Sequence, residues 1–83
     1  MEKSATFQAC IYLVGARFHL QNRSAAQYQK ALWLARKELP SLGSFIDSVW
    51  NLEKSSTDQI DDQLTKLMLE LEPGELMVLV NTL

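Results

Sequence analysis

The sequence predicts an all-α fold, a compact bundle of four to five short helices in a single helical domain over residues 1–83. Four stripes of apolar residues recur at helical spacing, and turn signals separate them. A Ser-x-x-Gln pattern, typical of helix N-termini, opens the second and fourth of these segments. The expected connections are only about two to four residues long, as in bundles of antiparallel helices.

The first helix is predicted over residues 4–20. One face carries apolar residues spaced i, i+4, i+7 and i+11, namely Phe7, Ile11, Val14 and Phe18. Residues 6–19 also admit an interpretation as two short strands around Gly15, because several of their side chains suit a sheet. Interspersed alanines favour the helix, and a lone hairpin on an otherwise helical domain is marginally stable. We therefore predict one helix here.

The second helix is expected to begin at a capping box made by Ser24 and Gln27. It should end before Pro40, because proline disfavours the helical region for the residue that precedes it. Its core face comprises Tyr28, Leu32, Ala35 and Leu39. A third helix is predicted over residues 42–54, with a buried face of Phe45, Ile46 and Val49 and with Trp50 as a further candidate.

The fourth helix opens at a second capping box, made by Ser56 and Gln59. Its apolar stripe comprises Ile60, Leu64, Leu67 and Leu71. A short last helix is predicted over residues 75–82. Pro73 suits its first turn, and the carboxylate of Glu75 suits the positive N-terminal end of a helix.

The composition is that of an ordinary globular protein, with 47% hydrophobic and 22% charged residues. Disordered chains and collagen-like repeats depart strongly from such values and are excluded. A chain of 83 residues buries only about 60% of its unfolded surface, which leaves little room for an internal active-site cavity.

The N-terminal segment carries no convincing targeting signal. Residues 4–16 lack charge but fall short of the about 20 apolar residues that cross a membrane. The apolar run at residues 9–16 fits a signal peptide poorly, because amphipathic sequence follows it in the same register. We expect a cytoplasmic protein without a membrane partner, in which the single cysteine, Cys10, stays reduced.

Charge is unevenly distributed along the chain. Residues 1–37 contain six cations and one acid, a net +5, whereas residues 38–83 contain two cations and nine acids, a net −7. The two halves can fold against each other so that their fields cancel. Alternatively, the basic half faces an acidic partner or nucleic acid. Screening within about 8–10 Å favours the first interpretation for a small domain.

No arrangement of residues predicts catalysis. Cys10 and His19 are nine residues apart, about 900° around a helix, so they lie on opposite sides and cannot act as a nucleophile–base pair. Cys10 should be a small buried hydrophobe, and His19 a partly exposed structural residue. Asp58, Asp61 and Asp62 suit a helix N-terminus and do not follow the calcium-loop pattern. We predict no enzymatic activity, no cofactor and no metal site.

Nucleic acid is the alternative partner that the sequence suggests. Arg23, Lys30 and Lys37 are seven residues apart on the second helix, and Trp33 lies within their stripe. A helix-turn-helix over residues 24–54 is disfavoured, since its second helix carries acids and no arginine.

The sequence contains more apolar residues than one core needs. The first helix has a second apolar side, made by Ala9, Tyr12, Leu13, Ala16 and Leu20. A helix apolar nearly all round is buried on more than one side, either in the centre of the bundle or at a subunit interface. Trp33 lies on the polar side of its helix, where a neighbouring segment covers it or a partner does.

We therefore predict a small non-enzymatic interaction module, a regulator or adaptor that binds a protein partner or a second copy of itself. The candidate contact residues are Tyr12, Leu13, Leu20, Arg23, Lys30, Trp33 and Lys37. The alternative is a small nucleic-acid-binding transcriptional regulator that uses the basic face of the second helix.

Overall fold

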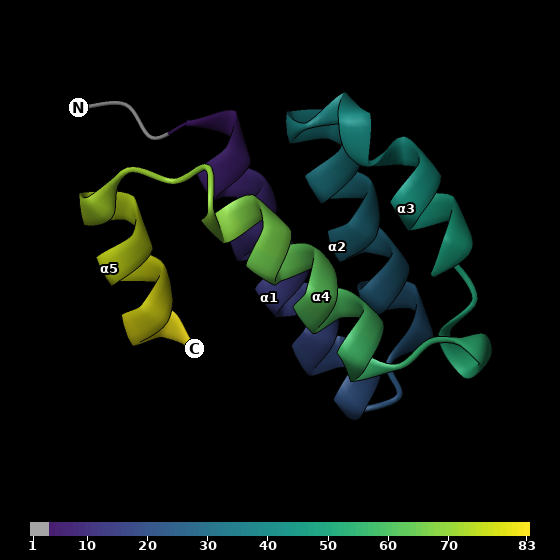
Figure 1. The fold of residues 1–83 in the computed structure, drawn as a ribbon. Coiled ribbons are helices and arrows are strands. Elements are labelled where there is room, and N and C mark those ends of the chain that lie inside the picture. Colours follow the sequence, from purple (N-terminus) through teal and green to yellow (C-terminus); the bar gives the residue numbers. More distant parts are fainter. Residues whose placement is uncertain (1–3) are drawn as a thin grey trace.

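A computed structural model describes residues 4–83 and confirms the all-α prediction (Figure 1). The chain forms α1 (Ala5–Gln21), α2 (Ala25–Glu38), η1 (Pro40–Leu42), α3 (Gly43–Ser48), η2 (Leu52–Lys54), α4 (Thr57–Met68) and α5 (Pro73–Thr82). The described residues contain no strand, so the segment with the competing hairpin interpretation is one continuous helix.

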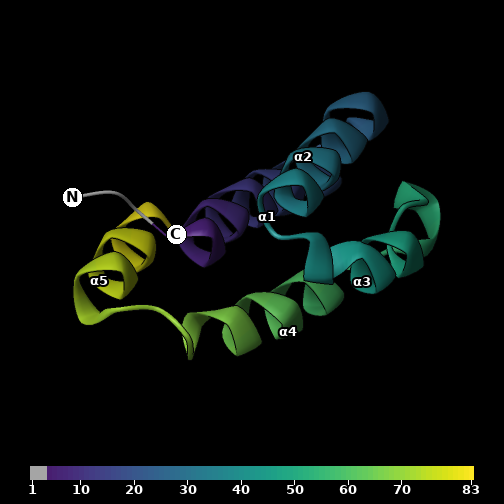
Figure 2. The ribbon, with the colours of Figure 1, turned by 90° about the horizontal axis from the view of Figure 1, so that it is seen from above.

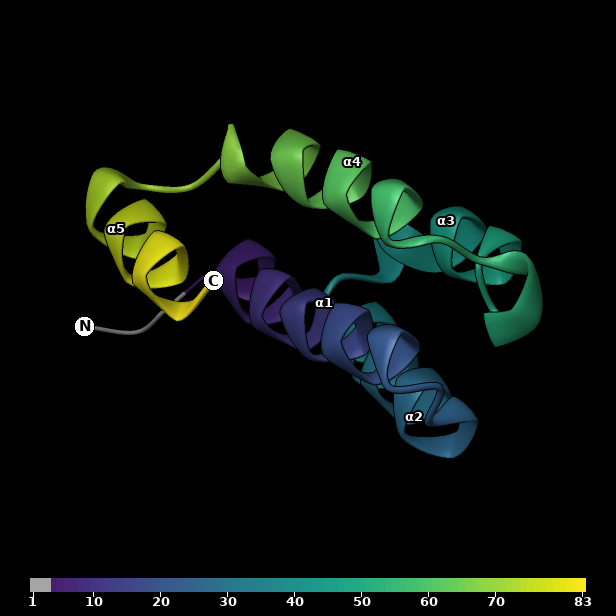
Figure 3. The same ribbon diagram turned by 90° about the horizontal axis from the view of Figure 1, so that it is seen from below.

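The helices are arranged in two layers. α1 and α2 lie side by side in one layer, and α3 and α4 follow each other along the second, as Figures 2 and 3 show from opposite sides. α5 lies at the N-terminal end of α1, on the side away from α2 (Figure 1). α1 packs mainly against α2, α4 and α5.

The buried side of α1 differs from the predicted stripe. Its buried residues are Phe7, Ala9, Cys10, Leu13, Ala16 and Leu20. Of the predicted stripe only Phe7 is buried, whereas Ile11 and Val14 are half-buried and Phe18 is 60% exposed. The side bearing Ala9 and Ala16 allows a neighbouring helix to approach closely, which the branched and aromatic side does not. Of the apolar faces of α1, the one that contains Ala9 and Ala16 is therefore buried.

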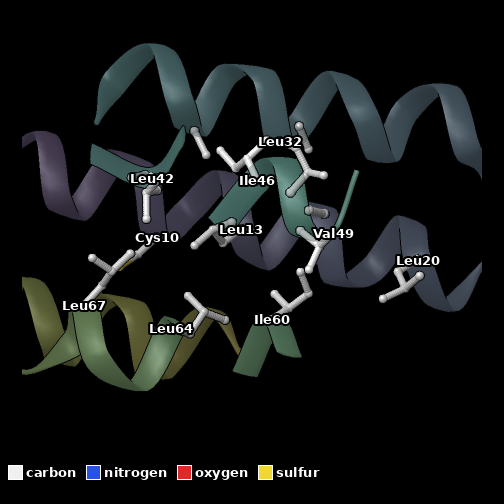
Figure 4. Packing of buried hydrophobic residues seen from close by; sticks show 14 of the residues in the cluster. Cys10, Leu13, Leu20, Leu32, Leu42, Ile46, Val49, Ile60, Leu64 and Leu67 are labelled. Atoms are coloured by element: carbon white, nitrogen blue, oxygen red, sulfur yellow. The ribbon is translucent and has the colours of Figure 1, made fainter. Parts of the chain in front are cut away.

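Leu13 and Leu20 belong to the core and are only 0% and 4% exposed. Leu13 lies among side chains from α2, α3 and α4, including Leu32, Ile46 and Leu64 (Figure 4). The prediction that Leu13 and Leu20 form a contact surface is therefore wrong. The extra apolar side of α1 is covered because α1 lies at the centre of this bundle.

One of the two predicted capping boxes forms, and the other does not. Ser56 and Gln59 form the predicted capping box of α4. Ser24 makes no side-chain cap bond, so the predicted box with Gln27 is absent. Ser56 has a ψ of 157°, typical of an N-cap, whereas ψ of Ser24 is 83°, because its N–H closes the end of α1 by donating to the carbonyl of His19.

The predicted helix over residues 42–54 is interrupted after Ser48. The buried Tyr28 hydroxyl donates to the Val49 carbonyl at 2.6 Å, and the Ser55 hydroxyl donates to the same oxygen at 2.8 Å. The Asn51 side chain accepts from the N–H of Glu53 and begins the next short helix. These bonds hold the 49–51 turn against α2, so continuing α3 through it would break them.

The last helix begins at Pro73, two residues before the predicted start. The Glu75 carboxylate accepts the Glu72 N–H through Oε1 and both the N–H and hydroxyl of Ser4 through Oε2, each of the latter at 2.9 Å. One side chain thus joins the first turn of α5 to the N-cap of α1. The predicted place of Glu75 at a positive helix end is confirmed, and the link to Ser4 fixes where α5 docks.

Arg23 occupies a backbone conformation that favours glycine. Its φ is 59°, and it is the only non-glycine residue with positive φ among residues 4–83. Its N–H donates to Leu20 and that of Ser24 to His19, the paired bonds of a Schellman motif. An L-residue in this position carries a steric cost that glycine avoids.

Arg23→Gly should therefore raise the free energy of unfolding, by up to about 1 kcal/mol after the greater backbone entropy of glycine in the unfolded chain is counted. Urea denaturation measures the change. Arg23→Lys keeps both the charge and the strain, so it should match the native chain. A glycine variant no more stable than the lysine variant contradicts this account.

Candidate functional site

Two exposed indoles flank a hollow between α2 and α3. Trp33 is 52% exposed and Trp50 is 41% exposed. Together with Arg36, Ile46 and Asp47 they line a cavity of about 150 Å³, and the buried Ile46 forms its floor. A second hollow, of about 380 Å³, adjoins it on the other side of Trp33 and Arg36. We call the lining residues of both hollows, Trp33, Arg36, Lys37, Pro40, Ile46, Asp47 and Trp50, the Trp33 surface.

The indoles are positioned by the core beneath them. Trp33 follows the fully buried Leu32 on α2, and this places its side chain on the outer side of the helix. The Gln29 side chain, one turn before Trp33, donates from Nε2 to the Trp50 carbonyl at 3.0 Å. This bond and that of Tyr28 to Val49 hold the turn after α3 against α2, so Trp50 lies near Trp33.

Two cations border the hollows. The Lys37 ammonium nitrogen lies 5.4 Å from the centre of the Trp33 ring, a cation–π geometry. The Arg36 side chain extends to the start of α3, where its Nε lies 3.6 Å from the position that a Cβ on Gly43 would take. Neither Arg36 nor Lys37 has a carboxylate oxygen within 4.0 Å among residues 4–83. Both cations are therefore available to a carboxylate from outside.

The uneven charge of the chain becomes an unevenly charged surface. Among the described residues, the cations of the N-terminal half lie on α1, on α2 and in the turn between them, whereas all acids except Glu38 lie after α2. One ion pair crosses between the layers in the described part of the chain, from Arg17 Nε to Asp61 Oδ1 at 2.7 Å. This ion pair joins α1 to α4. The cations of α2, Lys30, Arg36 and Lys37, are exposed.

The structure distributes the predicted contact residues over four places, three on the surface and one in the core. Trp33 and Lys37 lie together on the Trp33 surface. Tyr12 and Lys30 line a different groove, between α1 and α2. Arg23 is exposed in the α1–α2 turn.

Lys30 and Lys37 therefore border different hollows, although they share a helical stripe in sequence. Leu13 and Leu20 are in the core, as described above. The predicted residues do not form one site.

Trp50 lines the Trp33 surface but was not among the contact residues predicted from the sequence. It was a candidate for burial on a helix over residues 42–54, and the break after Ser48 turns it toward solvent instead. Asn51 was the available signal, because asparagine favours side-chain bonds to nearby backbone and turns over helix interiors.

Cys10 is part of the core and not of a reactive site. Cys10 is fully buried, which confirms its predicted role as a small core residue. Burial raises the pKa of its thiol to about 11, and the negative charges of Glu70 and Glu75 add to the effect. Among residues 4–83 no three His, Cys, Asp or Glu side chains are grouped so as to hold a metal ion.

No helix in the described residues has the length and apolar character needed to cross a membrane. Searches of protein-family models, of curated proteins and of solved structures find no match to this chain. The candidate function therefore rests on the surface itself.

The raised pKa of Cys10 predicts a loss of stability at alkaline pH. The unfolded thiol ionises near pH 9.0 and the folded thiol near pH 11, so the folded state holds its proton more tightly. The free energy of unfolding should consequently fall as pH rises between these values.

Urea denaturation across this pH range measures the effect, and Cys10→Ala should flatten the profile. Burial also raises the pKa of the Tyr28 hydroxyl, so some alkaline loss remains in the variant. Superimposable profiles for the two proteins would contradict the assignment.

Proposed function

We propose that this protein is a non-enzymatic interaction module, a regulator or adaptor, that binds a protein partner through the Trp33 surface. The observation that carries the proposal is the pair of half-exposed indoles around one hollow, with Arg36 and Lys37 beside them. Tryptophan and arginine are the residue types most enriched at binding hot spots, and a hollow between them suits an anchoring side chain.

The residues that line the Trp33 surface indicate which kind of protein segment would bind there. The hollow between the indoles has an apolar floor at Ile46, so it suits an aliphatic or aromatic side chain. Arg36 and Lys37 lie without carboxylate partners beside the adjoining hollow and suit acids next to that side chain. The expected ligand is a protein segment that combines an apolar anchor with carboxylates.

We favour a protein over nucleic acid because the basic residues that would contact phosphates are not grouped on one face. The nucleic-acid alternative relies on Arg23, Lys30 and Lys37 as one track, and these residues border different parts of the molecule. That alternative stays an outcome of the binding experiment.

Tryptophan fluorescence provides a direct binding measurement, because the chain has two tryptophans and both line this surface. A displayed library of random peptides, selected against the native protein, supplies the probes. We expect enriched peptides that join an aromatic or aliphatic residue to acids and that change the indole emission. Labelled single-stranded and duplex DNA, tested at low salt, should leave it unchanged.

Selected peptides that lack acidic residues contradict the proposal. DNA binding whose affinity falls steeply with salt concentration contradicts it as well. DNA binding of that kind supports the nucleic-acid alternative instead, because neutralised phosphates release counterions.

Trp33→Ala should abolish binding of the selected peptides and change stability little. The indole is half-exposed, so the expected cost is about 1–1.5 kcal/mol, half that of burying a large apolar side chain completely. Leu32→Ala, one residue away and fully buried, should cost about 2–5 kcal/mol. Thermal melts compare the two variants, and a Trp33→Ala loss similar to that of Leu32→Ala means that Trp33 is structural.

A further inference from the structure

A second surface lies on the outer face of the α1–α2 layer, opposite the face that α4 covers. It is a groove of about 320 Å³ between the two helices. Its apolar lining includes Tyr12, Ala31 and Leu34, while His19, Gln27 and Lys30 contribute polar groups. The groove shares no lining residue with the Trp33 surface.

Gly15 lies in this groove, in the middle of α1. Glycine in a helix interior costs about 0.5–1 kcal/mol relative to alanine. Its φ is not positive, and a Cβ built on it meets no atom within 4 Å. Nothing within residues 4–83 therefore requires glycine here, whereas a second backbone lying in the groove would benefit from the missing side chain.

An unpartnered apolar stripe lies on α5. Met77 and Val80, 68% and 51% exposed, lie three residues apart on one side of the helix, and Leu83, 63% exposed, continues this spacing at the C-cap. α5 is held to its own chain through other residues, the buried Leu79 and the bonds of Glu75 to Ser4. The stripe is therefore free to contact another molecule while α5 stays docked.

We propose that the α5 stripe of one copy of this chain docks into the α1–α2 groove of a second copy. A stripe with apolar residues at helical spacing suits a groove between two helices. Charge supports this pairing: the groove includes Lys30 and no acid, whereas residues 70–83 include the exposed Glu70 and Glu72 and no cation.

Charge also disfavours the symmetric alternatives. Two grooves facing each other bring Lys30 near its equivalent, and two α5 helices bring like acids together. The favoured contact is head-to-tail, so each copy in a pair keeps one groove or one stripe unoccupied. Association should therefore extend beyond dimers as concentration rises, and it leaves the Trp33 surface uncovered.

Complementation between two variants tests the proposal. Gly15→Glu fills the groove and adds a repelling charge, and Met77→Lys disrupts the exposed stripe. Sedimentation velocity should show a mass that rises with concentration for the native chain and monomers for each variant alone. An equimolar mixture should form a species of twice the monomer mass and nothing larger, because only one intact groove and one intact stripe can meet.

Matched controls separate the contact from general effects. Gly15→Ala adds a small side chain in open space and should weaken association less than Gly15→Glu. Val78→Lys changes an exposed α5 residue outside the stripe and should leave association intact. Circular dichroism confirms that each variant is folded, and Leu83→Lys replaces Met77→Lys if the latter unfolds.

A native chain that stays monomeric at every concentration overturns the proposal. A mixture that stays monomeric overturns it as well, as does a Gly15→Glu variant that still self-associates. These results leave the Trp33 surface untouched, because peptide binding is measured separately by indole emission.

Discussion

The excess of apolar surface on α1 is the constraint on which the rest of the structure depends. No single neighbour can cover a helix that is apolar nearly all round, so α2, α4 and α5 all pack on it. The core consequently has side chains of α1 at its centre, and the second layer serves to cover them (Figure 4). α3 contributes Ile46 and Val49 to the same core and is joined to α2 by the Tyr28–Val49 bond.

The sequence predicted the helices well because helix formation is read from local spacing and local caps. Ile60, Leu64 and Leu67 of the predicted stripe form the buried face of α4, since this helix has one apolar side and no competing one. Leu71, the fourth predicted member, is half-buried and lies beyond the end of α4 at Met68. α1 offered several apolar sides, and the choice among them depended on neighbours distant in sequence. The failed cap at Ser24 has a similar origin, because its backbone angles are set by the turn that closes α1.

The candidate site could be predicted only in part. Trp33 and Lys37 are one turn apart, so their association follows from helical spacing. Trp50 joins them through the turn after Ser48, which forms because Tyr28, Gln29 and Ser55 supply bonds to its carbonyls. Such bonds between distant residues leave no periodic signal. The prediction for Leu13 was wrong for a related reason. In the sequence, an apolar helix face that another protein covers has the same pattern as one that the rest of the chain covers.

The bonds between Ser4 and Glu75 connect residues 71 positions apart. α1 and α2 are joined by a turn of three residues, so their pairing closes a short loop and can form early in folding. α5 instead packs on the start of α1, far away in the sequence, and its only fully buried residue is Leu79. Its backbone amides should therefore exchange hydrogen sooner than those of α1 and α2, through openings that leave the central helices intact. α5, which carries the exposed Met77, Val78 and Val80, is thus also the helix that we expect to open most easily.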